Sequence, residues 1–537
     1  MTKENFLKGA AILGIAGVLA KILGSVYRIT LYYVLTDVGI GYYQTVYPLY
    51  NFLLAISTAG FPVAVAKLVA EKRALGDYKG AHRLFKITFF GFLFAGITTS
   101  LFVFIGAEYL SNLFSNKNAY YSYIAIAPAL MLVPIMSAFR GYFQGRQTMV
   151  PTAVSQLVEQ LFRVVVGLIL AYQFLGNGLP LAAGGATFGA SAGALAGTIV
   201  IMIIYLSQRK YIKQEIKDSI DCPSESLNSV IKKVLLIAIP ITIGASIVPI
   251  MNNIDVAIVM RRLQSIGFTE TEASGLYGRL AGMAQTLINL PQVLSVALAM
   301  SLVPAVSDAF ARKNHAKISK IVRSGIRVTL LIGLPSALGL YILSTPIIEL
   351  VYFVSDLETQ QSVGSILAIL SFSLIFLTLV QSLTAIMQGL GKPMIPVKNL
   401  AIGAVVKIIL TYILTGIPEI GVKGAALSTV VAYLVAAVLN FIAVIIKYTK
   451  TSLNFVNIFI KPIISVILMV VFVKFSYVFL SSVISSKIAT LVSIIVGALV
   501  YGFALLATGA ITSKDFELLP GGRKISKMLG AIGLLRE

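Results

Sequence analysis

The sequence contains few of the residues that soluble enzymes use for chemistry. Its 537 residues include one cysteine, Cys222, and two histidines, His82 and His315, each isolated among basic residues. A single cysteine cannot form an internal disulfide, and isolated histidines do not provide a metal site. The phosphate-binding pattern G-x-x-x-x-G-K-[ST] is absent, so we expect no ATPase activity on this chain. The sequence therefore predicts no metal, no cofactor and no enzymatic activity.

Charged residues are also scarce. They make up 12% of the chain, whereas 58% of the residues are hydrophobic, and the mean hydropathy is +0.91. This composition excludes a soluble globular protein. Apolar stretches of about 20 residues recur from Phe6 to Ile511 without the alternating pattern of barrel strands, so they are expected to span a membrane as helices. The first stretch is too long for a signal-peptide core, and we expect it in the mature protein.

Polar breaks divide the apolar stretches into fourteen expected helices. They cover residues 6–35, 41–66, 85–107, 120–142, 151–175, 186–207, 233–260, 273–308, 324–350, 362–386, 396–416, 422–446, 458–481 and 488–511. The eighth is too long for one simple span, so its front portion, 273–289, is expected to be an outer-face or broken segment before Pro291. The predicted fold is an all-α polytopic membrane protein.

The distribution of basic residues predicts the orientation. With a cytoplasmic N-terminus, the inner segments hold 32 Lys and Arg residues and the outer segments hold five. Cytoplasmic loops carry such an excess, so both termini are expected in the cytoplasm of a bacterial cell. The net charge of +22 is explained by loops that face anionic membrane lipids, and nucleic acid is not expected as a partner.

The chain also repeats itself. FQGRQTMVP, ending at Pro151, resembles MQGLGKPMIP, ending at Pro396, and GALAGT at 193–198 resembles GAALST at 424–429. The repeat predicts an N-lobe over 1–230, a C-lobe over 231–455, and accessory helices with a cytoplasmic tail over 456–537. Two pseudo-symmetric six-helix lobes in the same orientation are typical of transporters that work by alternating access.

Six cations fall inside the expected spans: Lys21, Arg28, Arg163, Arg279, Lys407 and Lys474. Lys21 and Arg28 are seven residues apart, so they share one helix face about 10 Å apart, with Gly24 and Ser25 between them. Charges in lipid are costly, and we expect this face to line an anion-binding cavity. The alternative is that Lys21 pairs with an acid while Arg28 reaches the outer surface.

The other charged residues inside the spans allow more than one role. Glu159 and Arg163 are one turn apart and form a structural or a functional ion pair. Asp255 is expected either to pair with a cation of the cavity or to couple transport to sodium or protons. Arg279 is expected at the outer mouth, and Lys407 is the counterpart of Arg163 in the repeat.

Together these charges make the expected interior positive. This bias suits a phosphate or diphosphate, and arginine is the best donor for forked contacts to such groups. Lys474, in the accessory helices, is expected to contact lipid headgroups. GASAGALAG at 189–197 has the glycine spacing of a dinucleotide loop, but no strand precedes it. Gly189, Gly193 and Gly197 instead predict a small-residue ridge for close helix packing.

Several segments together resemble a known family. LAKILGSVYR, STAGFPVAVAKLVAE, RGYFQGRQTMVPTAVSQLVEQLFRV and LPQVLSVALAMSLVPAVSDAFA are similar to the MurJ and SpoVB-like proteins. These form the polysaccharide-transport branch of the multidrug/oligosaccharidyl-lipid/polysaccharide (MOP) exporter superfamily. The resemblance implies a flippase that moves lipid II, an undecaprenyl-diphosphate-linked peptidoglycan precursor, to the outer leaflet. It also implies that the last two helices form part of a groove for the lipid tail, and that peptidoglycan synthases are candidate partners.

The resemblance extends unevenly to individual residues. Lys21 stands where Gram-negative relatives have an arginine, and their second arginine falls at Tyr27, next to Arg28. Their eighth-helix arginine matches Leu287 by spacing, so Arg279 is the candidate replacement. The substrate-binding residues predicted from the sequence are therefore Lys21, Arg28, Arg163, Arg279 and Lys407, with Asp255 and Glu159 for ion coupling or charge pairing.

Three other functions fit the sequence less well. The first is export of another polyprenyl-linked polysaccharide unit, and the second is a cation-coupled drug antiporter that uses Asp255 as the coupling acid. The third is a scaffold for wall synthesis that transports nothing. Membrane potential, sodium or protons are the candidate driving forces.

Overall fold

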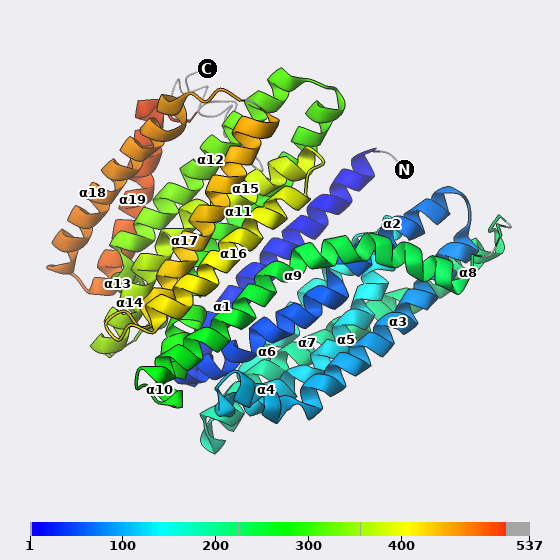
Figure 1. The fold of residues 1–537 in the computed structure, drawn as a ribbon, viewed down its shortest axis with the longest axis horizontal. Coiled ribbons are helices and arrows are strands. Elements are labelled where there is room, and N and C mark those ends of the chain that lie inside the picture. The colour runs from blue at the N-terminus through cyan, green and yellow to red at the C-terminus, as the bar shows by residue number, and fades with distance from the viewer. Residues whose placement is uncertain (1–2, 221, 224, 355, 450, 512–537) are drawn as a thin grey trace. The chain divides into compact units, whose positions relative to one another are not determined.

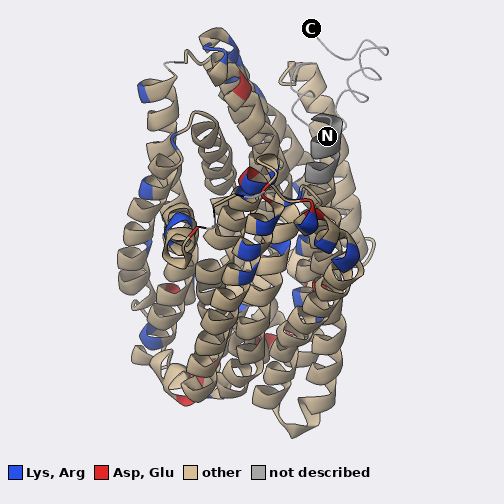
Figure 2. Ribbon diagram, turned by 90° about the vertical axis from the view of Figure 1, so that its right-hand side faces the viewer, with Lys and Arg blue, Asp and Glu red and all other residues tan. Residues whose placement is uncertain are grey.

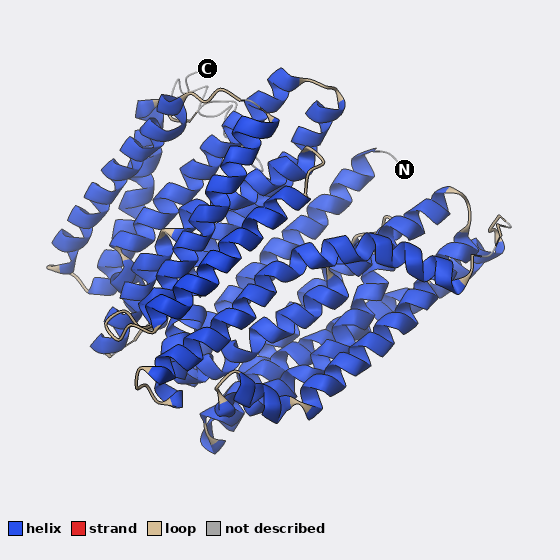
Figure 3. Ribbon diagram, in the orientation of Figure 1, coloured by secondary structure: helices blue, strands red, loops and turns tan. Residues whose placement is uncertain are grey.

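The computed structural model describes residues 3–511 except 221, 224, 355 and 450, with side chains from residue 12 onward. Within these residues every regular element is helical (Figure 3). Thirteen helical segments of the described chain are long and apolar enough to cross a membrane. The first, Ile12–Ala74, has 63 residues, about 95 Å of helix, and therefore provides two crossings. The all-α fold is confirmed, and the fourteen expected spans are consistent with these segments. The predicted cytoplasmic tail, 512–537, lies outside the described residues.

The chain divides into two compact units, Met1–Gly278 and Arg279–Glu537, here called unit 1 and unit 2. The helices of unit 1 (Figure 1) are α1 (Lys3–Thr58), α2 (Gly60–Ala74), α3 (Tyr78–Ile105), α4 (Ala107–Leu113), η1 (Lys117–Ala119), α5 (Tyr120–Gly145), α6 (Val150–Phe174), η2 (Leu175–Asn177), α7 (Leu179–Ser207), α8 (Arg209–Lys217), α9 (Leu227–Ser265) and α10 (Glu270–Tyr277). Unit 1 thus includes α9 and α10, which the sequence repeat assigns to the C-lobe. The repeat-based lobes stay a prediction.

Unit 2 begins in a π-helical turn and continues as helices throughout its described part. Its elements are η3 (Gly278–Ala284), α11 (Gln285–Ala311), α12 (His315–Ile342), α13 (Ser344–Tyr352), α14 (Leu357–Ser371), α15 (Ser373–Gly389), α16 (Met394–Thr415), α17 (Val422–Phe441), η4 (Ile442–Tyr448), η5 (Val456–Ile460), α18 (Lys461–Ser481) and α19 (Ser486–Thr508). The long eighth segment is interrupted at η3, which lies within the front portion, 273–289, that was expected to be irregular before Pro291. Pro291 itself lies within α11.

Charged residues are sparse on these helices. Figure 2 shows lysine and arginine as isolated patches on long uncharged stretches of ribbon. Because lipid offers no hydrogen bonds to the backbone, helices are the form in which such apolar sequence satisfies its own peptide groups. The polar side chains that do lie within the spans are therefore good markers of function or of specific packing.

A sharp bend divides α1 at Thr36, whose φ of 56° and ψ of −173° are not helical. The close approach of α10 accompanies the bend, since an added Cβ on Gly41 would collide with the backbone of Ser274. A Cβ on Gly278 would likewise collide with the carbonyl oxygen of Asp37. The bend lies where the sequence predicts the first helix to end, and it separates a partly exposed segment from a buried one.

The core of unit 2 is built from helical rows of aliphatic side chains. α11 contributes Leu298, Leu302 and Val306, which lie four residues apart, and α12 and α15 supply further buried Leu and Ile residues. The last helix, α19, is attached to α12 by a hydrogen bond. The Tyr501 hydroxyl of α19 donates to the carbonyl oxygen of Leu331 at 2.9 Å. This contact fixes one face of α19 and leaves the other exposed.

Candidate substrate-binding site

The first half of α1 presents the two cations on which the predicted site depends. Lys21 is exposed and Arg28 is half-buried. Neither side chain forms an ion pair or a hydrogen bond with the described residues, so the alternative in which Lys21 pairs with an acid is not observed there. A Cβ added to Gly24, between them, would meet no atom within 4 Å. The helix surface between the two cations is therefore open at Gly24, whereas Ser25, the other small residue on this face, is buried.

A cluster of buried tyrosines lies beside Arg28. The tyrosine cluster comprises Tyr27, Tyr43, Tyr47 and Tyr50, all on α1, on both sides of its bend. The ring centroids of Tyr27 and Tyr43 are 6.2 Å apart, and those of Tyr43 and Tyr47 are 4.4 Å apart. The Tyr27 hydroxyl donates to the carbonyl oxygen of Ala186 at 2.7 Å, which attaches this part of α1 to α7.

Arg163 of α6 lies against the same tyrosine cluster. It interacts electrostatically with Tyr43, Tyr47 and Tyr50, and Tyr43 also interacts with Arg28. The structure therefore brings two of the predicted substrate-binding residues, Arg28 and Arg163, to one cluster of phenol rings.

Glu159 joins two arginines rather than one. Its Oε1 accepts from Arg163 Nη2 at 2.9 Å, and its Oε2 accepts from Arg140 Nη2 at 3.1 Å. Arg140 Nε also donates to the Ser155 hydroxyl at 3.0 Å. The predicted Glu159–Arg163 pair is confirmed. The pairing of Arg140 with the same carboxylate was not predicted, because Arg140 was counted among the basic residues of an inner segment. With two guanidiniums to one carboxylate, this charge cluster keeps one net positive charge.

The glycine ridge of α7 explains how α6 holds these side chains in place. A Cβ on Gly193 would collide with the carbonyl oxygen of Glu159, and a Cβ on Gly189 would collide with that of Arg163. A Cβ on Gly197 would lie 3.2 Å from the Cβ of Glu159. Small residues allow this close approach of membrane helices. The predicted ridge is confirmed, and it supports the backbone of both charged residues.

Unit 2 holds the other two predicted binding residues on separate elements. Arg279, in η3, donates from Nη2 to the Thr359 hydroxyl at 3.1 Å and lies near Asp356, so it supports the start of α14. Lys407 is buried in α16 and also has interactions within the structure. One turn later, the Thr411 hydroxyl hydrogen-bonds that of Ser428 in α17 at 2.6 Å. The substrate-binding roles of Arg279 and Lys407 stay predictions.

Asp255 is half-buried in the second half of α9, where it interacts electrostatically with Tyr277 of α10. Both residues belong to unit 1, so Asp255 contributes to the contact between two consecutive helices. Its predicted role in ion coupling is compatible with a carboxylate that remains partly exposed. Lys474 is exposed on α18, where a long side chain can extend to lipid headgroups.

A second ion cluster, which sequence analysis did not predict, lies near the end of α2. Arg73 donates two parallel hydrogen bonds to Glu215 of α8, at 2.9 and 2.8 Å. Arg146 donates to the same carboxylate at 2.7 Å and lies over the Tyr142 ring. Burial raises the pKa of Glu215, but the hydrogen bond from Arg73 and the charge of Arg146 lower it more, so its pKa is below the usual value.

This Glu215 cluster joins parts of the chain that are 69 and 142 residues apart. It fixes the short helix α8 against α2 and α5. No local pattern could have predicted the contact, because each arginine is one of several in a basic loop.

Comparison with known proteins shows which family the chain belongs to. Residues 6–310 match the family described as "Polysaccharide biosynthesis protein", and residues 280–413 match the MatE family. The chain belongs to the polysaccharide biosynthesis protein family. The first match covers more than half of the chain, including the first half of α1, the tyrosine cluster and the Arg140–Glu159–Arg163 cluster.

Relatives within the polysaccharide biosynthesis protein family cover most of the chain. Stage V sporulation protein B of Bacillus subtilis is 28% identical, over 87% of this chain and 89% of its own. Lipid II flippase MurJ of the same organism is 26% identical, over 82% of each chain. A solved structure, "Lipid II flippase MurJ, inward closed conformation", matches with a TM-score of 0.68 and 16% identity, over 92% of this chain and 98% of the other.

These matches confirm the predicted membership of the MOP superfamily. They also agree with a multi-pass protein of a bacterial membrane. The structural match at this low identity shows the fold. The orientation of the termini stays a prediction from the basic residues.

Proposed function

We propose that this protein is a flippase for a polyprenyl-diphosphate-linked glycan, with the peptidoglycan precursor lipid II as its substrate. The observation that carries the proposal is the arrangement of Lys21 and Arg28 on one open face of α1. Both cations lack ion-pair partners among the described residues, and the helix surface at Gly24, between them, is unobstructed. Such cations in a membrane helix are costly unless an anion or water meets them.

A diphosphate fits this arrangement by charge. Lys21 and Arg28 are seven residues apart, so a diphosphate that moves along α1 meets a second cation about 10 Å from the first. Arg163 adds a forked donor beside the tyrosine cluster, and the cluster that it forms with Glu159 and Arg140 keeps a net positive charge. A cationic drug would be repelled by the same residues.

The names of the relatives support the same class of substrate. Two of them are Lipid II flippase MurJ and Stage V sporulation protein B, and the family description refers to polysaccharide biosynthesis. Transport would proceed by alternating access, driven by membrane potential, sodium or protons. Asp255 is the candidate coupling acid, and peptidoglycan synthases are candidate partners.

The experiment measures lipid II on the outer leaflet of a bacterium that is depleted of its own flippase and expresses this protein. We expect the wild type to restore exposure, and the Lys21→Ala/Arg28→Ala variant to restore much less while reaching the membrane in equal amount. Lys474→Ala is the matched control, because it also removes an exposed in-span cation but lies on α18. Full restoration by the double variant would contradict the assigned site.

Failure of the wild type to restore exposure, with the protein folded in the membrane, would contradict lipid II as the substrate. The same strain background then allows other polyprenyl-linked glycans to be compared. Export of another such glycan is the second candidate, because the family description names polysaccharides without restricting them to peptidoglycan.

A further inference from the structure

One face of α3 lines two pockets in succession. Near its start, α3 contributes Lys79, Gly80, Arg83 and Leu84 to a basic pocket. Farther along, it contributes Ile87, Thr88, Gly91, Phe92, Ala95 and Thr99 to an apolar groove. These residues form two rows at four-residue spacing, and such rows run continuously along a helix surface. The basic pocket and the apolar groove therefore follow one another along α3.

The opposite wall is continuous as well. Val230 of α9 lines the basic pocket, and its neighbours Ile231, Val234 and Leu235 line the apolar groove. All of these residues belong to unit 1. The two pockets thus form a cleft between α3 and α9 that is basic at one end and apolar farther along, where Ile56, Ser57 and Phe61 also line it.

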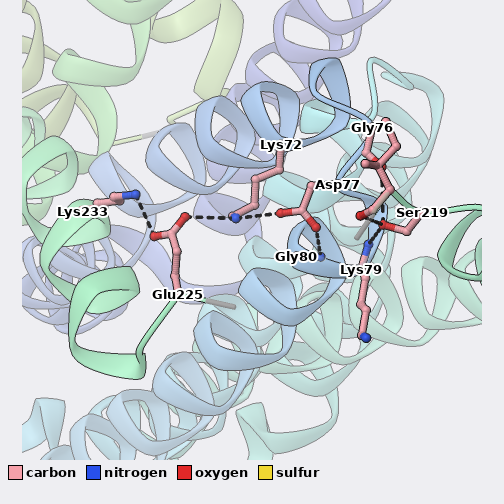
Figure 4. A network of polar contacts seen from close by, with 9 residues as sticks. Lys72, Gly76, Asp77, Lys79, Gly80, Ser219, Glu225 and Lys233 are labelled. Atoms are coloured by element: carbon pink, nitrogen blue, oxygen red, sulfur yellow. Dashed lines mark hydrogen bonds and ion pairs between the residues drawn. The ribbon is translucent and has the colours of Figure 1, made fainter. Parts of the chain in front are cut away.

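The acids of the basic pocket already have cationic partners. Lys72 lies 2.9 Å from Asp77 and 3.0 Å from Glu225, and Lys233 lies 2.7 Å from Glu225 (Figure 4). Asp77 also accepts from the backbone N–H of Gly80 at 2.6 Å, which caps α3. The acids therefore do not neutralise the remaining cations of the pocket.

Those remaining cations are Lys79 and Arg83. Both are exposed, and neither side chain has a hydrogen bond or an ion pair with the described residues. Figure 4 shows the ammonium group of Lys79 pointing away from the dashed contacts. The two residues are four apart on α3, so both can reach one anionic group at the mouth of the cleft.

The apolar groove has the length of a lipid chain in one leaflet. It runs along α3 from Ile87 to Thr99, which is about 18 Å of helix, and its volume is about 300 Å³. Half of a typical hydrocarbon core is about 15 Å. Gly91 keeps the groove open, because a Cβ added there would meet no atom within 4 Å.

We propose that this cleft binds one anionic glycerophospholipid, with its phosphate at Lys79 and Arg83 and one acyl chain in the groove between α3 and α9. Charge complementarity and the length of the groove identify this occupant. A 55-carbon polyprenyl chain is far longer than the groove, and an unlinked phosphate would leave the apolar part unfilled. The bound lipid would join α3 to α9 at a place distinct from the face of α1 that carries Lys21 and Arg28.

The experiment counts lipids bound to the full-length protein by native mass spectrometry in neutral detergent. The probes are phosphatidylglycerol, phosphatidylcholine and inorganic phosphate. Lys79→Gln/Arg83→Gln removes the phosphate contacts, and Gly91→Leu fills the groove. Lys86→Gln and Gly502→Leu are matched controls: Lys86 is exposed on α3 outside both pockets, and Gly502 is an exposed glycine of α19 with free space around its Cα.

We expect one tightly bound phosphatidylglycerol on the wild type and on both controls. The double glutamine variant should bind it about 30-fold more weakly, since each basic residue near the membrane surface contributes a factor of about five. Gly91→Leu should lose the tight site while keeping its helical circular dichroism.

Three results would overturn the proposal. They are equal binding of phosphatidylcholine, displacement of the lipid by inorganic phosphate at millimolar concentration, and losses in the two controls as large as those in the two test variants. The readout is binding and not transport, so its failure would leave the proposed flippase function untouched.

Discussion

Replacing Glu159 with glutamine tests the charge balance of unit 1. The carboxylate holds Arg140 and Arg163 together, and the three side chains are 11–17% exposed. Glutamine keeps the shape but removes the negative charge, which leaves two neighbouring cations uncompensated. Breaking a buried pair costs 3–5 kcal/mol, and because these groups are not fully buried we take the lower end, about 3 kcal/mol. For a unit that spans Met1–Gly278, that corresponds to a loss of about 5 °C in Tm.

Thermal unfolding in detergent, followed by size-exclusion chromatography, measures this loss. Glu71→Gln is the matched control, since Glu71 pairs with Lys67 on the surface, with both side chains more than half exposed. Surface pairs contribute about 0–1 kcal/mol, so the control should change Tm little. A double variant, Glu159→Gln/Arg163→Gln, should recover part of the loss because only one cation remains uncompensated.

Equal Tm values for Glu159→Gln and Glu71→Gln would refute this reasoning. Strict additivity in the double variant would refute it as well, because additivity means that the two side chains do not interact.

Three further predictions concern other contacts. The folded pKa of Glu215 is lowered, so the stabilisation that this carboxylate provides is present above its unfolded pKa of about 4.3 and is lost as the pH falls through the folded pKa. Pepsin should therefore cut α8 sooner as the pH drops below about 4. In Glu215→Gln this pH dependence should vanish. Gly193→Ala should lower Tm by several degrees because its methyl group collides with the α6 backbone, whereas Gly176→Ala, with free space around it, should not. Tyr501→Phe should cost about 1 kcal/mol by removing one hydrogen bond of α19, seen as faster amide exchange in that helix. The first prediction would be contradicted if Glu215→Gln kept the pH dependence of cleavage. The second would be contradicted by equal Tm values for the two glycine variants, and the third by unchanged amide exchange in α19.

Much of the fold could be predicted because lipid leaves the backbone few options. Long apolar stretches must be helices, so composition and polar breaks located the spans, including the separation near Thr36. Local spacing also sufficed for Glu159 and Arg163, which are one turn apart. The ridge of Gly189, Gly193 and Gly197 followed from the same periodicity.

Contacts between distant helices could not be predicted in this way. Arg140 reaches Glu159 from α5, and its position near a basic segment gave it the appearance of a loop residue. The pairing of Arg73 with Glu215 spans 142 residues, and many other basic residues compete for the same carboxylate on sequence grounds alone. Such partners depend on how helices pack, which a single sequence does not specify.

The bend at Thr36 has a mechanical consequence for α1. A β-branched residue at φ 56° is in a strained region of backbone space, at a cost of about 1–3 kcal/mol. Beyond the bend, residues 39–48 are all buried, so this part of α1 is held in place by its neighbours. Before the bend, the first half of α1, which carries Lys21 and Arg28, exposes much of its surface. Because Lys21 and Arg28 lie on the same helical segment before Thr36, a change in the backbone angles of this one residue would move both charges together.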